Sequence, residues 1–274
     1  MRFDEKDIGW LADLLAHAAD TEIMPRFRRL GGDDVQQKTS AADLVTVADV
    51  NAERAITEGL SERFPGALVV GEEAYERTPE LLDGLASADL AFVIDPIDGT
   101  FNFASGEPLF GVMLAVVAAG ETVAGLIYDP VGREWLTAVR GGGSYRLSQS
   151  GENIPCRVAD RVPVSGSTGS ISWQFMAEPL RSRLAGNHAK CLAQVGYRCA
   201  AHEYRMLALG HMHFALYSKL MPWDHLAGVL IHEEAGGYGA RFDGSRYRPG
   251  HADGGLLIAP DKASWEEFRR ELWA

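Results

Sequence analysis

The chain has 274 residues, a formal net charge of −12 and 46% hydrophobic residues. This acidic balance disfavours nonspecific binding to nucleic acid or to anionic membranes, because both require a basic surface. The longest apolar run, residues 109–119, is too short to span a bilayer, and the N-terminal segment lacks the apolar core of a secretory signal. With three cysteines that lack zinc-ligand spacing, we expect a cytoplasmic protein with free thiols and with neither nucleic acid nor a membrane as a partner.

Apolar periodicity predicts two helices followed by β-structure. A helix is expected over residues 8–18, before Pro25, and a second one follows Asp49 with apolar residues on one face. Strands are expected at 67–70, 90–94 and 110–117, and a hairpin at 123–138. The Gly-rich segment from 141 to about 160 is expected to be a connection between two halves of the chain.

Asp49 fits two roles. Together with Thr46 it matches a capping box in its aspartate variant at the start of the second helix. A functional interpretation makes Asp49 an outer carboxylate near a metal cluster, with Lys38 balancing the charge. Taken alone, Lys38 is typical of a surface lysine.

Two predicted strands run directly into carboxylates. Asp95 precedes Pro96, which favours extended backbone and makes Asp95 the expected last residue of its strand, and Asp98 follows three residues later. Glu72 follows the preceding strand, with Glu73 as an expected solvated neighbour. Such oxygen ligands suit a small, hard cation such as Mg²⁺, although Asp-Pro and Asp-Gly pairs also form ordinary turns and acidic residues after strands are usually solvated.

Gly99 and Thr100 follow the aspartates at a predicted helix start. The absence of a side chain at Gly99 would let a ligand approach the backbone, and free N–H groups at a helix start bind phosphate. The Thr100 hydroxyl could orient a water. These residues predict a metal-dependent enzyme that acts on phosphate.

Residues 222–237 are typical of a helix with a proline at its start and a Gly-Gly stop. Asp224 falls at its start, where it could cap the helix, bind a metal or do both. Trp223 is expected to be a packing anchor.

The ordered set GEE at 71–73, DPIDGTFNF at 95–103, WD at 223–224 and EAGG at 234–237 resembles the inositol monophosphatase family of Mg²⁺-dependent, lithium-sensitive phosphatases. The order and spacing agree from Lys38 to Gly237. The resemblance implies an α+β fold with layered αβαβα architecture, in one domain over residues 1–274 whose halves cover about 1–155 and 156–274. It also implies a homodimer.

The resemblance further implies a site with two or three Mg²⁺ ions. Its metal ligands would be Glu72, Asp95, the carbonyl of Ile97, Asp98 and Asp224, with Asp95 bridging. A water oriented by Glu72 and Thr100, with Asp49 behind Thr100, would attack phosphorus directly, without a phosphoenzyme. The N–H groups of Gly99 and Thr100 would hold the phosphate.

The expected substrate is a small-molecule phosphate monoester, such as an inositol monophosphate or a related sugar or polyol phosphate. Ala200 matches the substrate loop of the family, and Asp224 also faces substrate in this pattern. Inositol-specific members carry a glutamate seven residues before the Trp-Asp aspartate, where this chain has Tyr217, which offers a hydroxyl and no carboxylate. Ser170 and Trp173 are further pocket candidates. Lys219 could serve a more anionic substrate or be merely solvated.

Other functions remain open at this stage. Histidinol phosphate, fructose 1,6-bisphosphate and phosphoadenosine phosphate are alternative substrates within the same superfamily. A haloacid-dehalogenase-type phosphatase would have its aspartates two residues apart, whereas these are three apart. A noncatalytic metal-dependent binding protein on the same fold is the alternative from another class. The histidines, including His188, His202, His211 and His213, show no HExxH arrangement and are expected to be packing or surface residues.

Overall fold

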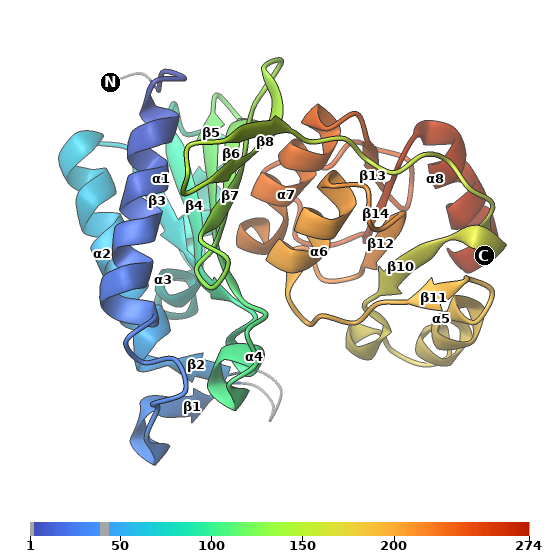
Figure 1. Ribbon diagram of the computed structural model, residues 1–274, viewed down its shortest axis with the longest axis horizontal. Helices are drawn as coiled ribbons and strands as arrows, with labels where there is room; N and C mark the ends of the chain where they lie inside the picture. The colour runs from blue at the N-terminus through green and yellow to red at the C-terminus, as the bar shows by residue number, and fades with distance from the viewer. Residues whose placement is uncertain (1–2, 39–43, 274) are drawn as a thin grey trace.

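Five layers of helices and sheets alternate in the computed structural model, which describes residues 3–38 and 44–273 (Figure 1). Two sheets enclose a central helical layer, and further helices cover the outer face of each sheet. The αβαβα architecture expected from the resemblance is therefore confirmed. None of the helices in the described ranges is long and apolar enough to cross a membrane.

The first sheet has seven strands arranged in chain order. They are β3 Leu68–Gly71, β4 Ala91–Asp98, β5 Gly111–Ala118, β6 Glu121–Asp129, β7 Glu134–Val139, β8 Gly143–Ser148 and β9 Asn153–Pro155. β3 and β4 are parallel and the other neighbours are antiparallel. Helices α1 (Asp7–Ala18) and α2 (Val47–Arg63) bury their apolar faces, including Leu15 and Ile56, against one side of this sheet.

The second sheet has five strands in the order β11-β10-β12-β14-β13. Their bounds are β10 Thr168–Ile171, β11 Ala193–Gln194, β12 Phe214–Tyr217, β13 Tyr238–Arg241 and β14 Leu256–Ala259. Helices α6 (Ala200–Ala208) and α7 (Pro222–Glu234) form the layer between the sheets, and α5 (Leu180–His188) and α8 (Lys262–Phe268) cover the outer face. β10 is parallel to β12, so the carboxyl ends of these two strands reach the same edge.

Three short elements complete the surroundings of the aspartates. The antiparallel pair β1 (Val35–Gln37) and β2 (Leu44–Thr46) carries Lys38 and leads into α2. Helix α3 (Glu72–Arg77) begins directly after β3, and helix α4 (Thr100–Ser105) begins directly after β4. β3 and β4 therefore each end at the start of a short helix.

The helix over 8–18, the hairpin over 123–138 and the capping box at Thr46 are confirmed. In this capping box the Thr46 side chain accepts from the Ala48 N–H, while Asp49 accepts from the Thr46 N–H at 2.8 Å. Because both groups are buried, this local exchange satisfies polar atoms that water cannot reach.

Two strand expectations were wrong. β4 continues past Asp95 to Asp98, and its register with β5 shifts between these two residues. Pro96 has no N–H for a ladder bond, so an irregularity lets the strand continue through it. The segment from 141 to 160, expected to be a connection, contains β8 and β9. Half-buried polar residues suit strands near a sheet edge, and apolar patterning therefore missed them.

Candidate active site

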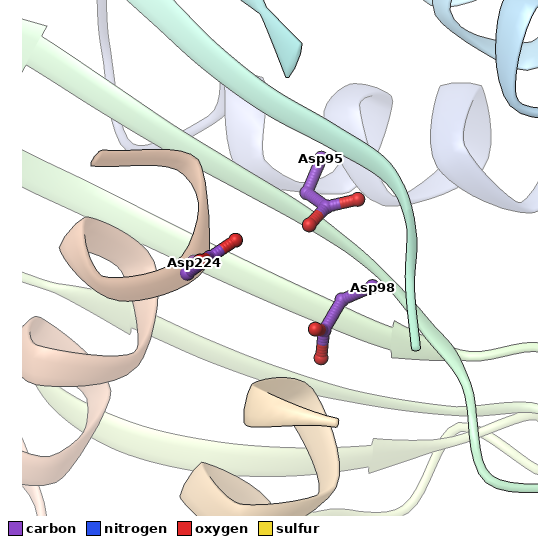
Figure 2. A group of neighbouring side chains, drawn as sticks. All are labelled: Asp95, Asp98 and Asp224. Carbon is purple, nitrogen blue, oxygen red and sulfur yellow. The ribbon is translucent and has the colours of Figure 1, made fainter. Parts of the chain in front are cut away.

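Three aspartates from separate parts of the chain converge in one place (Figure 2). Asp95 and Asp98 lie at the end of β4, and Asp224 lies in the first turn of α7. Each offers a carboxylate oxygen, and the three oxygens lie within 4.8 Å of one another. All three point into the space between strand and helix, with Asp95 and Asp98 buried.

The electrostatics of this group are unfavourable without a cation. Burial, followed by the charges of Glu72, Asp98 and Asp224, raises the pKa of Asp95 well above its ordinary value. Burial and the charges of Asp98 and Glu72 do the same to the pKa of Asp224. Oxygen donors at this spacing match what Mg²⁺ binds, and a divalent ion would relieve the repulsion. The donor set therefore fits the metal that the sequence predicts.

Hydrogen bonds hold the two β4 aspartates in place. Asp95 accepts from the Ile97 N–H at 3.0 Å, across the irregular stretch of the strand. Asp98 accepts from the Ala201 N–H at the start of α6 and from the Cys199 thiol at 3.0 Å. Because each aspartate retains oxygen lone pairs beyond these bonds, both remain able to bind a cation.

Glu72 lies in the same pocket, but its carboxylate is paired with Lys38 at 2.9 Å. Lys38 also donates to Glu73 at 2.7 Å, and its side chain is only 9% exposed. The expectation of a surface lysine and a solvated Glu73 was therefore wrong. Both groups are buried, and the lysine compensates two carboxylates that would otherwise be desolvated without a partner.

Thr100 and Asp49 are linked by a hydrogen bond. The Thr100 hydroxyl lies 3.1 Å from Oδ1 of Asp49 and 3.0 Å from the carbonyl oxygen of Ile97. The other oxygen of Asp49, Oδ2, takes part in the capping box with Thr46. Burial raises the pKa of Asp49 to about 7, although the Thr46 hydrogen bond opposes the shift. The two alternatives for Asp49 are therefore geometrically compatible.

Gly99 is required by the backbone and by packing. It precedes α4 with φ of +87°, a left-handed conformation that favours glycine. A Cβ added there would lie 2.8 Å from the carbonyl oxygen of Leu109 and 3.1 Å from Cβ of Cys199. The space expected to admit a ligand at this position is therefore filled by protein. Its own N–H and that of Thr100, the first residue of α4, have no partner within the helix, because the first N–H groups of a helix lack carbonyl acceptors.

A pocket of ≈ 580 Å³ joins the aspartates to the second half of the chain. The sequence-predicted residues that line it are Glu72, Asp95, Ile97, Asp98, Gly99, Thr100, Ser170, Trp173, Ala200, Tyr217, Lys219 and Asp224. Asp49 is not part of the lining and reaches it only through Thr100. Tyr217 ends β12, and Lys219 is exposed beyond it.

Sequence reasoning missed several lining residues, among them Phe101, Phe175, Arg198, Cys199 and Glu203. Arg198 stacks over the Phe101 ring at 3.6 Å, and Phe175 is 64% exposed. Glu203 is buried on α6, where its helical spacing from Ala200 and Leu207 places it on the inward face. Residues 200–208 were not predicted to form a helix, and an acidic residue at helical spacing from apolar residues was the signal that could have identified Glu203.

His188 and His202 behave as packing residues, whereas His211 is exposed at the surface. Nε2 of His188 lies 3.0 Å from the Gly169 carbonyl oxygen, and Nε2 of His202 lies 3.2 Å from that of Phe110. Within the described ranges the aspartate triad is the one group with metal-ligand spacing, and it contains no histidine.

The family model, the sequence relatives and the solved structures that this chain matches agree with one another. The model of the inositol monophosphatase family matches residues 11–274. A fructose-1,6-bisphosphatase/inositol-1-monophosphatase from Thermotoga maritima is 32% identical over 222 residues, which is 77% of either chain. A protein named Nus factor SuhB from Pasteurella multocida is 33% identical over 217 residues, again 77% of either chain. The solved structure of an IMPase from Thermotoga maritima superposes with a TM-score of 0.81 at 24% identity, covering 97% of this chain and 96% of that one.

Proposed function

Because the chain belongs to the inositol monophosphatase family, we propose that it is a Mg²⁺-dependent phosphatase of small phosphate monoesters of polyols or sugars. The observation that carries this proposal is the triad of Asp95, Asp98 and Asp224, which lines the same pocket as Thr100. Phosphate chemistry requires cationic stabilisation of the phosphoryl oxygens, and an acidic protein can supply it only with bound cations.

Two or three Mg²⁺ ions would be held by the triad, by Glu72 and by the Ile97 carbonyl. When bound, Mg²⁺ supplies neutralising charge, polarises the phosphoryl oxygens and lowers the pKa of water. The three aspartates are already close to one another. Glu72, the further side-chain ligand, has its carboxylate paired with Lys38 in this structure. Lys38 therefore balances the charge of the site.

The remaining roles belong to side chains and N–H groups. Thr100 and Glu72 orient the attacking water, and Asp49 fixes the Thr100 hydroxyl through the 3.1 Å contact. The N–H groups of Gly99 and Thr100, which lack partners within α4, bind the phosphate oxygens. Asp224, Ala200 and Tyr217 face the alcohol part of the substrate, since they line the same pocket from the chain's other half.

The test is release of inorganic phosphate with Mg²⁺ from inositol monophosphates, histidinol phosphate, fructose 1,6-bisphosphate, phosphoadenosine phosphate and p-nitrophenyl phosphate. We expect turnover of at least one monoester that disappears with EDTA and returns with Mg²⁺. Exposed Lys219 at the pocket favours the alternative of a second anionic group, which the bisphosphate arms test. Absence of Mg²⁺-dependent release from every ester would instead support the noncatalytic binding protein.

Four further properties complete the proposal. The chain forms a homodimer and is inhibited by lithium, both on the basis of the family resemblance. It acts in the cytoplasm, on the basis of composition and the three cysteines. It functions as one domain, because the pocket draws residues from both the α+β and the α/β half. Sedimentation and a lithium titration of the phosphatase assay test the first two properties.

A further inference from the structure

Three polar side chains that line the pocket come from the second half of the chain. Ser170 lies on β10, Tyr217 ends β12, and Glu203 lies on the inward face of α6. The parallel pairing of β10 and β12 brings the first two to one edge of the sheet. The Ser170 hydroxyl donates to Oε2 of Glu203 at 3.0 Å, so the carboxylate is fixed in position.

Glu203 is a buried acidic group that no cationic side chain pairs with in the described part of the chain. Glu203 is 5% exposed. Within residues 3–38 and 44–273, no lysine, arginine or histidine forms an ion pair with it. Burial raises the pKa of this carboxyl to about 7 despite the hydrogen bonds it accepts. A buried carboxyl without a cationic partner is costly to ionise, and a hydrogen-bond donor on a ligand would offset part of that cost.

The same part of the pocket lining contains hydroxyl groups that can form further hydrogen bonds. The hydroxyls of Tyr217 and Ser218 are buried, and neither has a hydrogen-bond partner of good geometry in the described part of the chain. Burial and the nearby Glu203 carboxylate raise the pKa of Tyr217 well above its ordinary value, so its hydroxyl stays protonated. Glu203, Tyr217 and Ser218 all line the cavity, so their side chains lie beside the space that a substrate would fill.

We propose that Glu203 selects substrates by accepting a hydrogen bond from a hydroxyl or ammonium group on the alcohol part of the phosphate ester. This inference rests on the proposed phosphatase function. The preferred substrates are polyol or amino-alcohol phosphates, because an alcohol part without a donor leaves the carboxylate unpaired. A site built to bond a donor discriminates strongly against analogues that lack one.

The test compares wild type with Glu203→Gln, which keeps the shape and removes the charge, and with Glu203→Ala. The substrates are inositol 1-phosphate, histidinol phosphate and p-nitrophenyl phosphate, whose alcohol part carries no donor. We expect KM for the first two esters to rise about 10–100-fold while kcat changes much less, because hydrogen bonds to charged groups account for factors of that size. The ratio of kcat/KM between the preferred ester and p-nitrophenyl phosphate should fall at least tenfold. A larger effect on histidinol phosphate identifies an ammonium donor, and a larger effect on inositol phosphate identifies a hydroxyl.

Glu233→Gln is the matched control, since Glu233 is a carboxylate on α7 that pairs with Arg140 and Arg246 outside the pocket. An unchanged selectivity ratio in both Glu203 variants, with folding verified by thermal unfolding, overturns the inference while leaving the phosphatase proposal intact. Calorimetry of inositol 1-phosphate and histidinol phosphate binding in Ca²⁺ separates the two proposals when turnover is absent. If Glu203→Gln binds at least tenfold more weakly than wild type, the inference is supported. If the two proteins bind equally, or if wild type binds neither ester, the inference is overturned.

Discussion

Replacing Asp224 by asparagine should change stability in opposite directions with and without a divalent ion. The three triad oxygens lie within 4.8 Å of one another, and at an effective dielectric constant of about 20 each charged pair at that distance repels by about 3.5 kcal/mol. Asp224→Asn removes two of the three pairs. In wild type, uptake of a proton by the triad already relieves part of this repulsion. Keeping an aspartate protonated at pH 7 costs about 4 kcal/mol, and this cost limits the stabilisation that Asp224→Asn can give.

Asp224 also lies in the first turn of α7, where the helix dipole favours a negative charge by about 0.3–1 kcal/mol. The repulsion is larger, so Asp224→Asn should stabilise the protein in EDTA by about 1–4 kcal/mol. In saturating Mg²⁺ the order should reverse, because wild type gains about 4.1 kcal/mol at a thousandfold excess over Kd and the variant gains little.

Urea unfolding at pH 7 in EDTA and in Mg²⁺ measures both effects, with calorimetry to report Mg²⁺ uptake. Glu233→Gln serves as a control for loss of a carboxylate on the same helix. A variant that is less stable than wild type in EDTA, or one that Mg²⁺ stabilises as much as wild type, would refute the electrostatic reasoning.

The remaining predictions concern activity, pH and backbone. Asp95→Asn should retain the fold by circular dichroism and lose turnover by orders of magnitude, and near-normal phosphate release would contradict the metal site. Glu203 has a folded-state pKa raised to about 7. Between the ordinary pKa of a glutamate and this value, the folded state binds a proton that the unfolded state has lost, so wild type loses stability as the pH rises through this range. The stability of Glu203→Gln relative to wild type should therefore increase by about 2–3 kcal/mol between pH 4.5 and 7.5 in urea unfolding, and a flat difference would argue against a raised pKa. Gly99→Ala should lower stability by more than Gly66→Ala, because both glycines have φ near +87° but only Gly99 has atoms, including the Leu109 carbonyl oxygen, in the Cβ position. Equal losses in thermal unfolding would show that the steric contact is unimportant.

Lys38 and Glu203 show where sequence reasoning reached its limit. Lys38 is typical of a surface residue in its local sequence, yet it is buried between Glu72 and Glu73, which lie more than thirty positions away. Glu203 lies on the inward face of α6, a helix that apolar periodicity did not predict. Partners that come from distant segments decide whether such a side chain is solvated, and composition and periodicity carry no information on those contacts.

The amino-acid sequence alone determined the elements and ligand types of this protein. Apolar periodicity predicted α1, the hairpin of β6 and β7 and the helix α7, and the order of the acidic motifs predicted the family, because these signals are local and survive in one dimension. Only the tertiary structure decided that Asp224 meets Asp95 and Asp98 within 4.8 Å and that β4 runs through Pro96. It also decided that Glu203 lines the pocket without a cationic side chain as its partner in the described part of the chain. Those outcomes depend on how two sheets pack against one helical layer, and burial and electrostatic cost arise only from that packing.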